Sequence, residues 1–108
     1  MTLSDFEQQV FAAARASSIC GIPLVRRLTV TSVNLRVGLT VGGFIDAFYN
    51  EQTGTTAFAL IREDRRVFGA DNTGGWHMHP FKDPRLHVVL SQPMTFNDFV
   101  ATIERELA

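Results

Sequence analysis

The sequence predicts a single α+β domain over residues 1–108, with an N-terminal and a C-terminal helix packed on one face of an antiparallel β-meander of four to five strands. Apolar residues recur at helical spacing near both ends of the chain, and they alternate with polar residues through its middle. Turn residues separate the alternating segments. With 45% hydrophobic and 19% charged residues, the 108-residue chain has the size and composition of one ordered domain.

The first predicted helix runs from Ser4 to about residue 16. Ser4 can cap this helix, and Glu7 completes a capping box three residues later. Gly21 and Pro23 oppose continuation of the helix. One apolar stripe follows the helix and consists of Leu3, Phe6, Val10, Ala13 and Ala14.

The predicted meander occupies residues 26–70. Its apolar positions change from even to odd numbers near Thr31-Ser32, which predicts a bulge or a turn at that point. Gly42-Gly43 predicts a tight hairpin before a strand over 44–49. Turns at 50–54 and 63–65 then delimit strands over 56–62 and 66–70.

A loop, a short apolar run over 86–90 and a final helix complete the predicted domain. Thr95 is the predicted cap of this helix, and Asp98 stands at the capping-box position. The buried stripe of the helix is predicted to contain Phe96, Phe99, Val100, Ile103 and Leu107.

The segment from Gly69 to His87 contains all three histidines and the only tryptophan. His77 and His79 project to the same side if this segment is extended, and Pro80 favours an extended His79. One imidazole can then accept a proton while the other donates one. This division suits metal-free cleavage of RNA, in which a ribose 2′-hydroxyl attacks its own phosphate, so His77 and His79 are the candidate catalytic residues.

Five neighbouring residues are candidates for substrate binding. Arginine binds phosphate through two parallel hydrogen bonds, aspartate and asparagine shape turns, and tryptophan stacks on bases. The candidates are Arg62, Arg66, Asp71, Asn72 and Trp76. Each residue type also has a structural interpretation: a solvated edge for the arginines, a plain turn for the Asp-Asn pair, and a core contact for the tryptophan. We expect Trp76 and Met78 to point away from the histidines, toward the last helix.

Two other interpretations of the histidine pair remain open. Together with His87 or Asp83, His77 and His79 can form a metal site, although a His-x-His pair alone is a weak signal for zinc. Alternatively, the imidazoles only hydrogen-bond backbone carbonyls and hold a surface loop in shape. The acid–base interpretation needs no metal and no cofactor, and we expect none.

Composition limits the classes of partner and location. The net charge of −1 and the pI near 6.3 give no bulk attraction to polyanions, so an RNA contact needs a local basic patch. Cys20 is the only cysteine, which favours a reducing cytoplasm. There is no signal-peptide pattern and no apolar run near the roughly 18 residues of a membrane span. We expect a cytoplasmic protein that makes no membrane contact.

Four segments resemble the TumE-type family, small prokaryotic toxins of toxin–antitoxin pairs: Phe44–Asn50, Ala57–Ile61, Phe68–Asn72 and Gly75–His79. In that family a meander strand precedes Asp-Asn, a short glycine-containing loop, His-x-His and a closing helix. The similarity extends over roughly residues 36–107. It implies a toxin-like effector whose cognate antitoxin carries a helix-turn-helix domain, with RNA as its target.

The alternative to an enzyme is a non-enzymatic interaction module. Nine phenylalanines in 108 residues can supply an apolar sheet face through which two copies form a homodimer. In this interpretation the histidine loop is a rigid protein-binding edge.

Overall fold

The computed structural model describes residues 1–107, which form two helices and one seven-stranded antiparallel sheet. The elements are α1 (Leu3–Ala16), β1 (Leu24–Leu28), β2 (Ser32–Gly38), β3 (Phe44–Asn50), β4 (Thr56–Arg62), β5 (Arg65–Asp71), β6 (His77–His79), β7 (Val88–Val89) and α2 (Phe96–Leu107). The strands lie in the sheet in chain order, so the sheet is a meander. The predicted α+β class is confirmed, and the strand count is higher than four to five. The additional strand β6 lies in the segment predicted as a loop, and β7 lies in the short apolar run predicted over 86–90.

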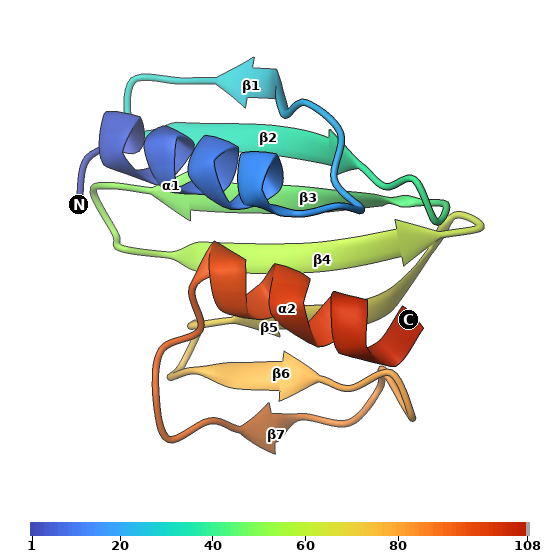
Figure 1. Cartoon of the computed structure of the whole chain (residues 1–108). Coiled ribbons are helices and arrows are strands. Elements are labelled where there is room, and N and C mark those ends of the chain that lie inside the picture. Colours follow the sequence, from blue (N-terminus) through green and yellow to red (C-terminus); the bar gives the residue numbers. More distant parts are fainter. Residues whose placement is uncertain (108) are drawn as a thin grey trace.

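Both helices pack on the same face of the sheet. α1 lies over β2 and β3, and α2 lies beside it over β4 and β5 (Figure 1). Period-two alternation along β2, β3 and β4 places every second side chain under these helices. Within residues 1–107 the opposite face carries no helix.

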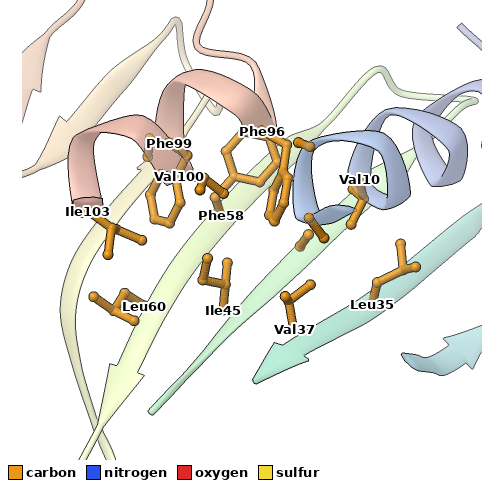
Figure 2. Packing of buried hydrophobic residues seen from close by; sticks show 14 of the residues in the cluster. Val10, Leu35, Val37, Ile45, Phe58, Leu60, Phe96, Phe99, Val100 and Ile103 are labelled. Atoms are coloured by element: carbon orange, nitrogen blue, oxygen red, sulfur yellow. The ribbon is translucent and has the colours of Figure 1, made fainter. Parts of the chain in front are cut away.

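Phenylalanine rings fill the core between the helices and the sheet. Phe58 of β4 stands near its centre, where it contacts Phe96 and Phe99 of α2 with ring centroids 5.6 and 5.4 Å away (Figure 2). Its ring also lies 6.3 Å from Phe6 of α1, which joins the two helices through one strand residue. Burying such a side chain contributes about 1.5–3 kcal/mol.

The capping box of α1 begins two residues earlier than predicted. Thr2 accepts a hydrogen bond from the Asp5 amide, and the Asp5 carboxylate accepts one from the Thr2 amide. The prediction of a Ser4–Glu7 box was therefore wrong. Both pairs match the capping pattern, but a start at Leu3 adds a residue that packs against the core. The predicted box of α2 is confirmed, because Thr95 and Asp98 exchange the same two hydrogen bonds.

Turns account for the changes of direction in the first half of the sheet. A turn over 29–31 joins β1 to β2 and is closed by the Thr29 amide donating to the Ser32 carbonyl at 2.9 Å. A turn thus produces the change of apolar positions from even to odd numbers near Thr31-Ser32. The next turn spans 39–43, so β2 ends at Gly38 and the Gly42-Gly43 pair closes a longer connection than the predicted hairpin. No helix among residues 1–107 has the length and apolar character needed to span a membrane.

Candidate functional site

His77 and His79 lie on the face of the sheet that the helices leave uncovered. In the pairing of β5 with β6, His77 is opposite Asp71, Met78 opposite Ala70, and His79 opposite Gly69. Ala70 and Met78 belong to the core side, so the alternating histidines point to the other side with Asp71. The period-two spacing of His77 and His79 predicts this arrangement.

His87 joins the other two histidines because of the short strand β7. Val88 pairs with Met78 and Val89 with His77, so continuing the register places His87 opposite His79. The ring centroids of His79 and His87 lie 4.4 Å apart, and that of His77 lies 5.2 and 5.1 Å from them. One nitrogen of each ring lies within 4.8 Å of the others. We call these three residues the histidine cluster.

Asp71 faces this cluster because the turn that follows it fixes its carboxylate. The Thr73 amide donates to Oδ1 of Asp71 at 3.0 Å, and the Gly75 amide donates to the Asn72 carbonyl at 3.1 Å. Gly74 and Gly75 have φ values of 71° and 108°, which glycine adopts without strain. Oδ2 of Asp71 is thereby held 3.3 Å from Nε2 of His77 and 3.8 Å from Nε2 of His79.

The two nitrogens of His77 face oxygen atoms. Nδ1 lies 3.1 Å from the carbonyl oxygen of Gly75, which can only accept, so we assign a proton to Nδ1. In the neutral ring the lone pair then sits on Nε2, facing the Asp71 carboxylate, which is also an acceptor. The 3.3 Å contact is favourable only with a proton or a cation between the two atoms.

His79 is the buried member of the histidine cluster, with 4% of its surface exposed. Burial lowers the pKa of His79, and the nearby charges of Arg66, His87 and His77 lower it further, whereas Asp71 acts in the opposite direction. Within residues 1–107 its Nδ1 is buried and has no hydrogen-bond partner. Near neutral pH the imidazole is therefore uncharged and keeps a lone pair available.

Arg66 reaches the histidine cluster through a β-bulge. Leu60 pairs with Phe68 but Ile61 pairs with Arg66, so the extra residue in β5 turns Arg66 to the uncovered face. Its side chain crosses Gly69, where a Cβ atom would lie 3.1 Å from Cδ of Arg66. Because Gly69 is the partner of His79, the missing side chain makes room for an arginine beside the cluster.

Three of the predicted substrate-binding residues lie elsewhere. Arg62 donates to the Val41 carbonyl at 3.2 Å, in the turn before β3. The Asn72 side chain accepts from the Thr56 amide and donates to the Gly54 carbonyl, which joins two turns. Trp76 packs on the core side, 6.5 Å from Phe58. The structure thus brings His77, His79, Asp71 and Arg66 together and adds His87.

Asp83, considered in the sequence as a metal ligand, is not part of the group. Its carboxylate accepts two hydrogen bonds from the Arg85 side chain, at 3.1 and 3.2 Å. These bonds lower the pKa of Asp83. Asp71 occupies the position beside the histidines.

Comparisons with protein-family models, with curated proteins and with solved structures find no match to this chain. The histidine cluster and its neighbours are therefore the features of this chain that bear on its function.

Proposed function

We propose that this protein is a toxin-like effector that cleaves RNA by metal-free acid–base catalysis at His77 and His79. The observation that supports this most is the convergence of both imidazoles with the Asp71 carboxylate and the Arg66 guanidinium on the uncovered face of the sheet. These are the groups that phosphodiester cleavage needs: a base, an acid, and a cation for the phosphate.

The two histidines have different surroundings, which suggests their roles. His79 is the base, because its lowered pKa keeps the ring neutral. His77 is the acid, because both of its nitrogens face oxygen acceptors toward which a protonated ring donates. Asp71 is a positioning residue that orients His77, and Arg66 binds the phosphate.

The proposed reaction is an attack of the ribose 2′-hydroxyl on the neighbouring phosphate. His79 takes the proton of the ribose 2′-hydroxyl while the 2′-oxygen bonds to phosphorus. The bond from phosphorus to the 5′-oxygen breaks, and His77 gives its proton to that oxygen. The products are a 2′,3′-cyclic phosphate and a 5′-hydroxyl end.

Cleavage of a fluorescent RNA oligonucleotide in the presence of a chelator tests this mechanism. We expect cleavage of RNA and none of the all-deoxy oligonucleotide, which lacks the attacking hydroxyl. His77→Ala should lower kcat by about 10²- to 10⁴-fold, the usual contribution of an acid or base. Full activity of both His77→Ala and His79→Gln, each verified as folded by circular dichroism, would contradict the mechanism.

A matched pair of arginines tests the phosphate contact. Arg66→Ala should raise KM and lower kcat, because the guanidinium beside His79 is lost. Arg85→Ala is the control, since its side chain is 90% exposed and bound to Asp83. Equal activity of the two variants would remove Arg66 from the site.

Expression in a bacterial host tests the toxin proposal. We expect growth arrest by the wild-type chain, relief by the His77→Ala and His79→Ala double variant, and rescue by a helix-turn-helix antitoxin encoded next to the gene. The proposal places this activity in the cytoplasm, where RNA and antitoxin are present. Growth arrest that persists in the double variant would exclude the catalytic version.

A non-enzymatic module that forms a homodimer through its sheet is a second candidate, favoured by the apolar edge strand β1. Leu24, Val25 and Leu28 of β1 are exposed, as are Ile22 and Val30 on either side of it. Exposed strand edges pair readily with a second chain. Sedimentation over a range of concentrations decides this point. A dimer that Val25→Lys dissociates supports it, and a monomer at all concentrations excludes it.

A further inference from the structure

We infer that the histidine cluster, together with Asp71, binds one divalent transition-metal ion such as Zn²⁺. The four donor groups come from three neighbouring strands or strand ends: Asp71 closes β5, His77 and His79 form β6, and His87 precedes β7 (Figure 1). Antiparallel pairing fixes all four on one face of the sheet. Binding of the ion itself does not depend on the proposed cleavage of RNA.

The spacing of the donors suits a tetrahedral ion. Zinc binds nitrogen at about 2.0–2.1 Å and carboxylate oxygen at about 2.0–2.2 Å, so two ligand atoms of one tetrahedral ion stand about 3.3–3.5 Å apart. Nε2 of His77 and Oδ2 of Asp71 already lie 3.3 Å apart, and Nε2 of His79 lies 3.8 Å from the same oxygen. The three imidazole nitrogens, all within 4.8 Å of one another, need to approach by at most about 1.5 Å.

The positions of the oxygen atoms around His77 also suit a cation. With Nδ1 donating to the Gly75 carbonyl, the free lone pair of Nε2 faces the Asp71 carboxylate. Two acceptors at that distance repel each other unless a proton or a metal cation lies between them, and an ion can take the place of the proton. The hydrogen bond at Nδ1 also fixes the tautomer and the orientation of the ring, as the outer hydrogen bonds of metal-bound histidines do.

His79 provides an independent observation. Its ring is buried, yet within residues 1–107 its Nδ1 has no hydrogen-bond partner. Because no hydrogen bond to a residue of 1–107 fixes Nδ1, the ring can carry its proton there and leave the lone pair on Nε2, which lies 3.8 Å from Oδ2 of Asp71. The buried ring thus offers one nitrogen to the same small region as the other two imidazoles.

The donor set selects the class of metal. Three imidazoles and one carboxylate suit Zn²⁺, Ni²⁺ and Cu²⁺, whereas Mg²⁺ and Ca²⁺ prefer sites made of oxygen. The only thiol, Cys20, pairs with Leu39 and takes no part. Arg66 carries a positive charge near the site, but its side chain is exposed and hydrogen-bonded to the Pro84 carbonyl, so it can move aside.

If the proposed function holds, a bound ion inhibits the cleavage of RNA. Coordination uses the lone pair with which an imidazole accepts a proton. An ion held by His77 and His79 therefore stops acid–base cleavage, and the metal acts as an inhibitor that a chelator removes.

Titration of chelator-treated protein without a polyhistidine tag tests the binding. Zn²⁺ is added in competition with a chromophoric chelator, and Mg²⁺ serves as the contrast. We expect one Zn²⁺ per chain and no competition from Mg²⁺ at millimolar concentration. His87→Ala removes an exposed ligand, and we expect it to weaken binding by at least about 100-fold, since loss of even an outer-shell partner costs 10- to 100-fold.

Two aspartates provide the matched control. Asp71→Asn should weaken Zn²⁺ binding at least about 10-fold, since the charge beside the histidines is lost. Asp83→Asn should leave the affinity unchanged, because that carboxylate binds Arg85 outside the histidine cluster. Equal affinity of wild type, His87→Ala and Asp71→Asn would show adventitious binding and overturn the inference, as would absence of Zn²⁺ binding.

The activity assay separates this inference from the proposed function. Binding of one Zn²⁺ with inhibition of RNA cleavage supports both. Binding by a protein that cleaves no RNA supports the metal site and contradicts the proposed enzyme. Cleavage that requires Zn²⁺ supports the metal site and contradicts the metal-free mechanism.

Discussion

Gly43 and Gly54 offer a direct measure of how closely the turn before β3 packs against β4. Their φ values are nearly equal, 81° and 76°, so an alanine at either position carries the same backbone strain. Their surroundings differ. A Cβ at Gly54 meets nothing within 4 Å, whereas a Cβ at Gly43 would collide with the Ile61 carbonyl oxygen and lie 2.7 Å from Cγ of Arg62.

The expected losses of unfolding free energy follow from these contacts. Left-handed backbone costs an ordinary residue about 1–2 kcal/mol, which is the whole effect expected for Gly54→Ala. Gly43→Ala adds an overpacking cost of about 1–3 kcal/mol, because a strand carbonyl must move. We therefore expect the free energy of unfolding to fall by about 1–2 kcal/mol in Gly54→Ala and by about 2–5 kcal/mol in Gly43→Ala.

Urea unfolding followed by far-UV circular dichroism measures both variants under the same conditions. The m-values should match that of the wild type, so that the midpoints report stability alone. Equal losses at the two positions would refute the reasoning, since they would show that the contact with β4 relaxes without cost. Zn²⁺ affinity is the internal control, because the turn over 39–43 is remote in the sheet order from β6 and β7.

Three further predictions concern the core, the loop after His79 and the thiol. Phe58→Ala should lower the free energy of unfolding in urea by about 3–5 kcal/mol. Phe11→Ala should lower it far less, because Phe11 is 38% exposed. Equal losses of unfolding free energy would place Phe58 outside the core. Phe81→Ala should weaken Zn²⁺ binding, because Phe81 anchors the loop between His79 and His87 by stacking on Phe68 at 4.7 Å; unchanged affinity would contradict this anchoring. Burial raises the pKa of the Cys20 thiol, so iodoacetamide at pH 8 should react with it more slowly than with an unstructured cysteine peptide, and an equal rate would contradict that burial.

The central strands could be predicted from the sequence because each carries a full period-two pattern. Phe44–Asn50 and Thr56–Arg62 alternate over seven residues each and are bounded by turns, so their limits were predicted to within a residue. The strands β6 and β7 have three and two residues, which are too few to show a period. They form because the turn over 72–75 returns the chain along β5, and this depends on pairing rather than on local pattern.

The site could be predicted in part for the same reason. The shared side of His77 and His79 follows from their spacing alone. The position of His87 does not, since it depends on the register of a two-residue strand that begins nine positions after the end of β6. Asp71 was predicted as a substrate-binding residue, but its contact with the histidines depends on the cross-strand pair that it forms with His77.

Arg66 shows most clearly why local pattern was insufficient. By strict alternation with Phe68 and Ala70, an even-numbered residue of β5 belongs to the core side, where an arginine would be buried without a partner. The bulge between Leu60 and Ile61 reverses the facing of β5 at that point and turns Arg66 to the side of the histidine cluster. Gly69 then leaves the space that the side chain crosses. The alternation in the sequence and the observed side of the sheet thus disagree at Arg66, and the bulge accounts for the difference. Bulges next to active sites often redirect a side chain in this way.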